Sequence, residues 1–197
     1  MKKLLLAVFI LLGLTGCASN LILDDNKPKS MPVVDYVDLD RFMGDWYVIA
    51  TIPTFLERDA YNPIETYQLN SDGTIATTFT FNKGSLNGPT KIYRPRGFIK
   101  DRRTNAIWDM QFVWPIKADY RIVYLDDDYQ QTIIGRNSRD FVWVMARTPR
   151  ISEQDYLNLV TMVGSLGYNL NDLQLSLIHI SEPTRRYAIS YAVFCLK

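Results

Sequence analysis

Side chains suited to covalent or metal chemistry are scarce in this sequence. The 197 residues contain one histidine, His179, and two cysteines, Cys17 and Cys195. Nucleophilic catalysis commonly pairs a serine, threonine or cysteine with a base such as histidine, and zinc sites are built largely from His and Cys. Three consecutive aspartates at 126–128 could hold calcium weakly, but such clusters are also ordinary in hairpin turns. We therefore expect no enzyme activity, no metal and no cofactor.

Cys17 is the clearest chemical site because of the sequence before it. Two lysines near the start are followed by eleven uncharged residues, 4–14, and then by Thr15 and Gly16. A basic start, a short apolar run and small residues before a cut site are typical of a secretory signal. The run is shorter than the roughly 20 residues that span a bilayer. A buried core helix is the alternative, but it leaves the lysines and small residues unexplained, so we predict a signal peptide over residues 1–16.

Residues 14–17, Leu-Thr-Gly-Cys, resemble the lipobox of bacterial lipoproteins. The resemblance implies that cleavage precedes Cys17, that its thiol carries diacylglyceryl, and that the new amino terminus is acylated, as by palmitate. Several acyl chains together anchor a protein stably, whereas one binds only marginally. Ala18 and Ser19 follow without an aspartate, which by the same resemblance implies a lipid-anchored position in the cell outer membrane. With Cys17 lipidated, no disulfide is expected.

The chain divides into four expected segments. After the signal, residues 17–35 form a lipidated N-terminus and a tether, which is polar and carries two prolines, as extended spacers do. Residues 36–175 form the folded domain. Residues 176–197 show no clean periodicity, and their string SLIHISEPTR resembles read-through of a sequencing adapter. We interpret this last segment as a non-native tail that is not part of the folded domain; a genuine final strand and tail is the alternative.

The folded domain alternates between β-favouring runs and turn signals at short intervals, which predicts an all-β fold. We expect eight strands in an antiparallel up-and-down barrel, which removes exposed sheet edges by closing. One C-terminal helix is expected to pack outside the barrel, since Ser152 is a good N-cap and Gly167 marks an end. The expected strands are 45–52, 64–70, 74–81, 90–100, 106–114, 120–126, 130–136 and 141–147.

Three short motifs narrow this fold class. Residues 42–50 carry Gly44 and Trp46 in a G-x-W pattern at the first strand, residues 120–126 fall on the sixth, and residues 145–149 precede the helix. In this order and spacing they resemble the three signature regions of the lipocalin family. Together with the lipobox, the resemblance indicates a bacterial outer-membrane lipoprotein of that family, and it covers the whole folded domain.

The signature motifs imply structural roles for three residues. Trp46 would plug the closed end of the barrel, and Arg147 would lie across its indole as a cation–π partner, a contact worth about 0.5–2 kcal/mol. Gly44 would let the segment before the first strand cross closely beneath the barrel. These residues identify the fold and are not expected to touch a ligand.

A ligand cavity would be lined by one face of several strands, because alternate side chains of a strand face opposite sides. An eight-stranded barrel either holds one small ligand or is filled by side chains, so core packing is the alternative for each lining residue. The residues expected to line the cavity are Phe79, Phe81, Trp108, Met110, Phe112, Trp114, Ile122 and Tyr124.

An apolar cavity tethered to an outer membrane, together with the family resemblance, indicates fatty acids or lysophospholipids as ligands in lipid transport, storage or maintenance. A ligand head group would meet Arg58 or Lys83 near the open end, which loops 53–63, 82–89, 115–118 and 137–139 surround. The alternative is a structural or partner-binding lipoprotein with a filled barrel. We expect membrane attachment through the acyl groups, and a monomer or homodimer.

The charge balance excludes one class of partner. The formal net charge is +1 over the whole chain, whereas nucleic-acid-binding domains carry a strong basic patch. Six basic residues fall between 91 and 103, and we interpret them as a solvated strand face and turn. No nucleic-acid partner is expected.

Overall fold

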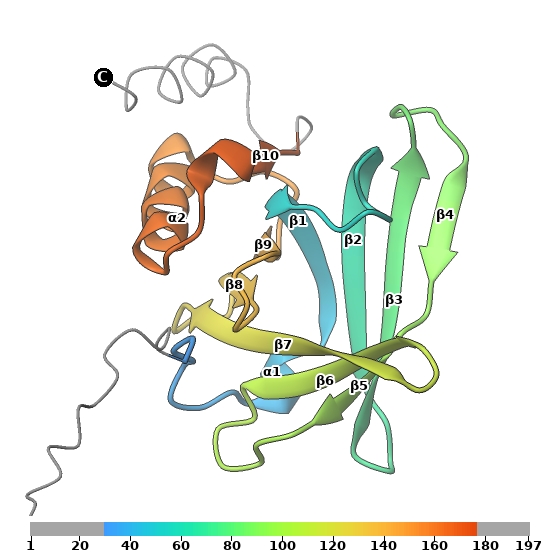
Figure 1. Ribbon diagram of the computed structural model, residues 1–197, viewed down its shortest axis with the longest axis vertical. Coiled ribbons are helices and arrows are strands. Elements are labelled where there is room, and N and C mark those ends of the chain that lie inside the picture. The colour runs from blue at the N-terminus through green and yellow to red at the C-terminus, as the bar shows by residue number, and fades with distance from the viewer. Residues whose placement is uncertain (1–29, 177–197) are drawn as a thin grey trace, which may run out of the picture.

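The computed structural model describes residues 30–176, which form a closed antiparallel β-barrel with one long helix outside it (Figure 1). Apart from β4 and β5, each strand from β1 to β9 pairs with its neighbour along the chain, and β9 pairs with β1 to close the barrel. β4 and β5 both pair with β3 and share one place in the wall, which gives eight strand positions. The strands are β1 (Gly44–Ile52), β2 (Ala60–Leu69), β3 (Thr74–Lys83), β4 (Thr90–Tyr93), β5 (Arg96–Ile99), β6 (Ile107–Val113), β7 (Ile116–Leu125), β8 (Gln131–Gly135) and β9 (Val142–Ala146).

The expected strand at 90–100 is broken in the structure, because it contains Pro95. β4 ends at Tyr93 and β5 starts at Arg96. Proline has no N–H to give to a sheet ladder, although the Pro95 carbonyl still accepts from the Thr77 N–H at 3.1 Å. Two other strands are longer than expected, since β2 begins at Ala60 and β7 at Ile116. The predicted eight-stranded barrel is otherwise confirmed.

The barrel wall opens along one seam. β1 and β2 are paired from Gly44 to Tyr47 on β1, and above this point the two strands diverge. The freed edge of β1 pairs instead with β10 (Gln174–Leu175), through Ala50 and Thr51. β10 therefore covers an edge that would otherwise present unpaired backbone groups.

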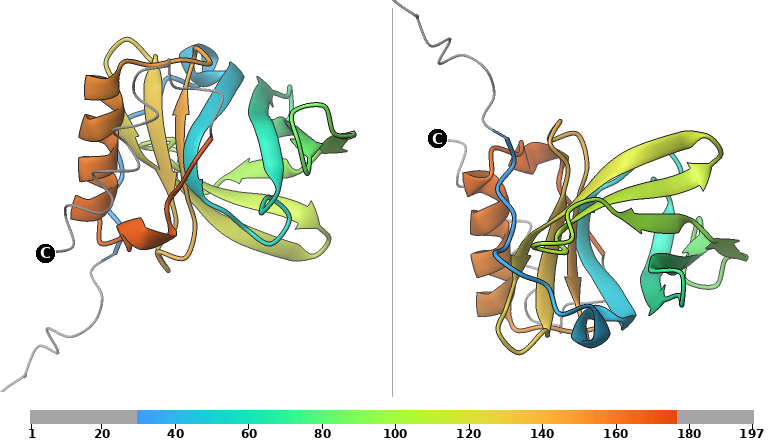
Figure 2. Two further views of the ribbon diagram at one scale, coloured as in Figure 1. Left: turned by 90° about the horizontal axis from the view of Figure 1, so that it is seen from above. Right: turned by 90° about the horizontal axis from the view of Figure 1, so that it is seen from below.

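The helix α2 (Glu153–Ser165) begins and ends where the sequence predicts. Ser152 is its N-cap, with Oγ accepting from the Asp155 N–H at 3.1 Å. Gly167 follows the helix with a φ of +89°, the left-handed conformation that favours glycine. Figures 1 and 2 show α2 against the outer face of β8, β9 and β1, on the opposite side from β3 and β4. Within residues 30–176, no helix is long and apolar enough to cross a membrane.

Two hydrophobic cores result. One lies inside the barrel at its closed end, where the short helix α1 (Leu39–Phe42) seals it. The other lies between the barrel wall and α2, where Leu159 and Val163 of the helix are buried against Ile133 and Val144. A turn of 3₁₀ helix, η1 (Leu170–Asp172), leads from α2 to β10.

Candidate functional site

The closed half of the barrel is filled by aromatic rings. Trp46 is fully buried, and its Nε1 donates to the Phe42 carbonyl at 2.9 Å. The Phe42 ring lies 5.1 Å from that of Trp46 and 5.6 Å from that of Trp108. Tyr67 and Tyr120 lie at the upper boundary of this cluster, with Tyr120 stacked on Trp108 at 5.3 Å. These rings fill the inner core of this half.

Arg147 closes the barrel from below. Its guanidinium carbon lies 3.9 Å from the centroid of the Trp46 ring. The same group donates to the carbonyls of Arg41 at 2.7 Å, Phe42 at 3.0 Å and Asp45 at 2.9 Å. One planar cation thus ties α1 to the start of β1.

Gly44 stands directly under this guanidinium. Its φ is +96°, and an added Cβ would lie 3.4 Å from Arg147 Nη1. Backbone conformation as well as close approach therefore favours glycine at this position.

The open half contains a cavity of about 300 Å³. Its walls are mainly apolar, with contributions from the β1–β2 loop, the β6–β7 hairpin and the ends of β8 and β9. Pockets of about 300–1,000 Å³ with a few placed polar groups are typical of small-molecule sites. The lining residues used below are Glu57, Glu65, Phe79, Met110, Phe112, Tyr120, Arg136 and Trp143.

Two buried carboxyl groups face this cavity. Glu57 is 9% exposed; its Oε2 accepts from the Thr54 N–H at 2.8 Å and its Oε1 from Trp143 Nε1 at 3.0 Å. Burial raises the pKa of Glu57, and the hydrogen bonds from Thr54 and Trp143 oppose this. Each carboxyl oxygen of Glu57 thus has an N–H partner.

Glu65 belongs to a chain of buried hydroxyl groups. Tyr67 donates to Glu65 Oε2, and the Tyr120 hydroxyl lies 2.6 Å from that of Tyr67. Burial raises the pKa of Glu65 to about 7; the Tyr67 hydrogen bond opposes this, and the neighbouring Glu57 adds to it. Both tyrosines have a pKa well above its ordinary value, chiefly through burial, so they remain neutral.

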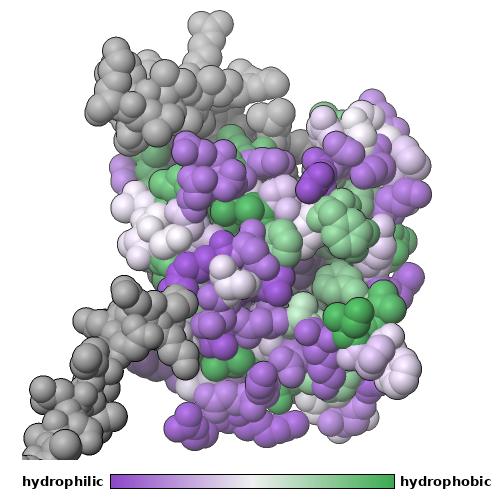
Figure 3. All heavy atoms as spheres, viewed as in Figure 1, coloured by the Kyte–Doolittle hydropathy of each residue, from purple (hydrophilic) through white to green (hydrophobic). Residues whose placement is uncertain are grey.

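The mouth of the cavity is basic on one side and apolar on the other. Arg136 follows β8 and pairs with Asp140 at 3.2 Å, while its Nε is buried without a partner among the described residues. Across the opening, the β6–β7 hairpin exposes Val113, Trp114 and Ile116, at 66%, 82% and 70%. Figure 3 shows green apolar groups on the right half of the view, among polar ones.

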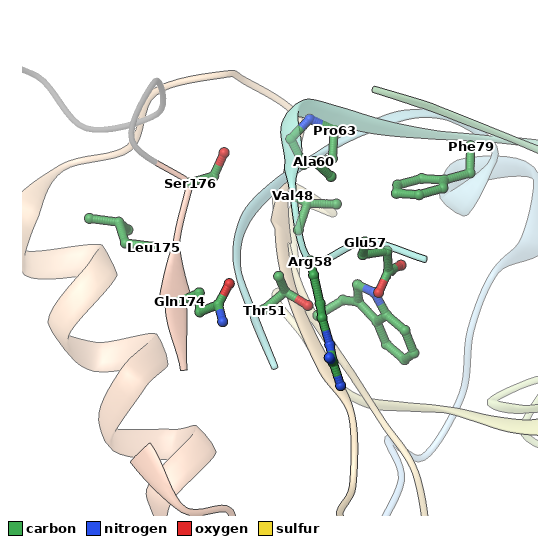
Figure 4. Close-up of a pocket in the computed structure, with 11 residues that line it drawn as sticks. Val48, Thr51, Glu57, Arg58, Ala60, Pro63, Phe79, Gln174, Leu175 and Ser176 are labelled. Carbon is green, nitrogen blue, oxygen red and sulfur yellow. The ribbon is translucent and has the colours of Figure 1, made fainter. Parts of the chain in front are cut away.

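A second cavity, of about 50 Å³, lies at the seam between β1 and β2. Glu57 and Phe79 line both cavities, so Glu57 stands between them. The volume suits one or two waters at about 30 Å³ each. Figure 4 shows the residues around it, including Gln174, Leu175 and Ser176 on one side and Ala60 and Pro63 on the other.

The structure separates the residues expected to line a single cavity. Phe79, Met110 and Phe112 line the open-half cavity. Trp108 and Ile122 are fully buried in the closed half, as parts of the inner core. Phe81 is buried beside Phe79 and stacks on Tyr93 at 6.0 Å. The last two, Trp114 and Tyr124, do not face the interior, so the expectation that each shares an inner face is wrong.

Irregularities in the strands explain both corrections. The pairing of β7 with β8 shifts between Ile122 and Tyr124, so Tyr124 turns outward and packs in the core under α2. The pairing of β6 with β7 shifts between Met110 and Val113, and Trp114 then sits in the hairpin turn. A bulge of this kind moves every later side chain to the other face.

The most informative polar groups of the site were not predicted from the sequence. Glu65 and Tyr67 alternate on β2, but so do their neighbours Ile64 and Thr66, and either pair could face inward. Arg136 was expected only as the end of a strand. Of the cations expected near a ligand head, Arg58 lines the seam cavity and Lys83 pairs with Asp59 at 3.2 Å.

Cys17, the signal segment and residues 177–197 lie outside the described residues. Within residues 30–176, no group of three or more His, Cys, Asp or Glu side chains could hold a metal ion.

The chain is similar in sequence to known lipocalins. A family model described as a lipocalin-like domain matches residues 37–177. The chain is 32% identical over 156 residues to temperature-induced lipocalin-1 of Arabidopsis thaliana, which covers 75% of this chain and 82% of the plant protein. It is 30% identical over 159 residues to outer membrane lipoprotein Blc of Citrobacter freundii, covering 79% of this chain and 85% of that protein.

Solved structures with the same arrangement share little sequence with this chain. Insecticyanin from the tobacco hornworm Manduca sexta is similar with a TM-score of 0.57 at 17% identity, covering 79% of this chain and 86% of that one. The cockroach allergen Per a 4 is similar with a TM-score of 0.55 at 17% identity, covering 81% and 96%. At 17% identity, these similarities show that the fold is shared.

Proposed function

Since the chain belongs to the lipocalin-like domain family, we propose that it binds small apolar ligands in the open half of its barrel, held at the outer membrane by lipid on Cys17. The observation that carries this proposal is the cavity of about 300 Å³ above a filled closed half. Members of the family bind small hydrophobic molecules, and this cavity has the apolar walls that such molecules require.

The size of the cavity limits the ligand. At about 30 Å³ for a group the size of a water molecule, there is room for about ten such groups. Burying about ten methylenes yields at most about 8 kcal/mol, from which the loss of ligand freedom subtracts. We therefore propose fatty acids or lysophospholipids of which part of the chain is buried, bound with micromolar or weaker affinity.

Arg136 is the proposed contact for an anionic head group. It lines the cavity at its mouth, and its buried Nε has no partner among residues 30–176. A carboxylate or phosphate there would pair with the charge of the Arg136 guanidinium and leave the chain pointing toward Phe79. The polar mouth then sets the orientation of the ligand.

Membrane attachment rests on the sequence before the barrel and on relatives. The lipobox-like residues at 14–17 precede a polar, proline-containing stretch. Relatives named outer membrane lipoprotein Blc, from Citrobacter freundii and Escherichia coli, are 30% and 26% identical to this chain. Mass spectrometry of the N-terminal peptide from a bacterial membrane fraction should show diacylglyceryl and acyl groups on Cys17. Recovery of an unmodified Cys17 peptide would contradict the anchor.

The binding proposal is tested by titrating the purified full chain with decanoate and following tryptophan emission. Trp143 lines the cavity, so we expect saturable quenching, and native mass spectrometry should recover co-purified lipid. Phe112→Asp should weaken binding at least tenfold. Ile92→Asp is the matched control, because Ile92 is 48% exposed and Phe112 49%, yet Ile92 does not line the cavity.

The alternative is a structural or partner-binding lipoprotein with a filled barrel. The aromatic cluster of the closed half shows that such filling occurs over part of the barrel. That alternative predicts no quenching, no recovered lipid and equal behaviour of the two aspartate variants.

A further inference from the structure

The buried end of the cavity is acidic, not apolar. Glu57 and Glu65 both line it, and they are 9% and 8% exposed. Acidic side chains are almost never this buried unless they are paired. Buried polar groups without partners are costly, so each oxygen needs a donor. This requirement makes the hydrogen bonds of the two carboxyl groups informative about the ligand.

One carboxyl oxygen lacks such a donor. Both oxygens of Glu57 accept N–H donors, from Thr54 and Trp143. Glu65 Oε2 accepts from Tyr67, whereas Glu65 Oε1 accepts no hydrogen bond within residues 30–176 and keeps some accessible surface. It differs in this from Thr77 Oγ1 and Arg136 Nε, which are fully enclosed and also have no partner within those residues. Each tyrosine hydroxyl has a single proton, so the order Tyr120 to Tyr67 to Glu65 uses all of them.

The cations that line the cavity do not neutralise the acidic floor, by which we mean the buried side chains of Glu57 and Glu65. Arg136 is at the mouth and pairs with Asp140, and Asp119 is held by Arg121 at 2.8 Å. Arg58 lines the seam cavity on the other side of Glu57 (Figure 4), without an ion pair to it among residues 30–176. A ligand carboxylate placed beside Glu65 would meet like charge, whereas a hydroxyl or ammonium group would be a donor to it.

We propose that the cavity selects an apolar ligand whose buried end carries a hydrogen-bond donor, a hydroxyl or an ammonium group, which Glu65 Oε1 accepts. This rests on the proposed binding function and specifies its ligand class. A purely apolar pocket penalises a hydroxyl group that it buries, so the two possibilities predict opposite effects of adding one.

The test compares three ligands of equal length on the purified full chain at pH 8: decanoate, 10-hydroxydecanoate and 10-aminodecanoate. Each has a carboxylate for the mouth, and they differ only at the far end. We expect the hydroxyl and amino ligands to bind at least fivefold more tightly than decanoate, by tryptophan quenching. In Glu65→Met, which is unbranched and of similar length, the added hydroxyl should weaken binding. Glu153→Met, on the exposed first turn of α2, should behave as wild type.

A pH series on the wild-type chain gives the same test without a variant. The groups facing Glu65 are Glu57 from the β1–β2 loop, Tyr67 on β2, Tyr120 on β7 and Trp143 on β9, with Arg136 and Asp119 nearer the mouth. The pKa of Glu65 lies near 7, so the advantage of the amino ligand over decanoate should grow at least threefold from pH 6 to pH 8.

The outcomes separate the two proposals. If none of the three ligands quenches emission, the binding function fails. If decanoate binds as tightly as the hydroxyl and amino ligands, or if their advantage persists in Glu65→Met, the binding function stands and the donor requirement is overturned. If Glu65→Met does not fold, the pH series decides instead. A ratio of amino-ligand affinity to decanoate affinity that does not change with pH would then overturn the donor requirement.

Discussion

The two halves of one barrel are built from the same strands and have opposite interiors. In the closed half, large rings from α1, β1, β2, β6 and β7 pack against one another, some edge to face and some stacked or tilted. In the open half, the same strands enclose about 300 Å³. Cavity volume is therefore set by where the large rings stop. Tyr67 and Tyr120 form that boundary, and a carboxyl group rather than another ring lies above them.

The polar groups of the two halves also differ in kind. Below the boundary, Trp46 Nε1 and the Arg147 guanidinium donate to backbone carbonyls. Above it, Glu65 Oε1 and Arg136 Nε have no partner among the described residues. The closed half should therefore determine stability, and the open half should determine which ligand is bound.

Truncating the plug should have the largest effect. Trp46→Ala removes a fully buried indole and its hydrogen bond to Phe42, and we expect a loss of about 3–5 kcal/mol in the free energy of unfolding. Urea denaturation followed by circular dichroism measures this. A loss below about 1 kcal/mol would show that the closed half is not the stabilising half.

Raising the pH should weaken the fold through the acidic floor. The pKa of Glu65 is about 7 when folded and near 4.5 when unfolded, so between these values the folded state holds more protons. Unfolding free energy should therefore fall as pH rises from 5 to 7, by about 2 kcal/mol, and level off above about pH 8. Burial of Glu57 acts in the same direction.

Denaturation curves at pH 5, 6, 7 and 8 measure this slope. Glu65→Gln should flatten it and should be the more stable protein at pH 8. A slope of opposite sign in this window, or one unchanged in Glu65→Gln, would be inconsistent with a buried acid at this position.

Exchanging the closing cation should cost less. Arg147→Lys keeps the charge but cannot reach the carbonyls of Arg41, Phe42 and Asp45 together. Hydrogen bonds from a charged donor are worth about 2 kcal/mol, and we expect a destabilisation of that size by urea denaturation, with decanoate affinity unchanged. A change in affinity without a change in stability would break the proposed division between the halves.

The smallest effect is expected at the rim. Trp114 is 82% exposed at the tip of the β6–β7 hairpin, and substitutions at such exposed sites usually change stability by less than about 0.5 kcal/mol. Trp114→Ala should therefore unfold at the wild-type urea concentration. It should also leave the decanoate-induced quenching in place, since the exposed indole does not line the cavity.

The fold could be predicted from the sequence, but the cavity could not be predicted in full. Alternation, turn residues and the N-cap at Ser152 are local signals, and the barrel and α2 follow from them. Assigning a residue to the inner face requires uninterrupted alternation, which register shifts near Met110 and Ile122 destroy. For this reason Trp114 and Tyr124, which alternation predicts to line the cavity, do not line it.

The acidic floor could not be predicted for a different reason. An acid on a strand is ordinarily placed on the solvent face, and Glu65 alternates with Ile64 without a pattern that decides between them. Its inward direction is set by the pairing of β2 with β1 and β3. Long-range pairing of this kind is not encoded in any short window of sequence.

The divergence of β1 from β2 above Tyr47 has a mechanical consequence. Below that point, widening the barrel would break ladder hydrogen bonds between the two strands. Above it, the upper end of β2 can move outward, together with β3, without breaking any bond of that ladder. The circumference of the barrel is therefore fixed by the ladder where the rings are packed, whereas beside the cavity no β1–β2 ladder bond opposes widening.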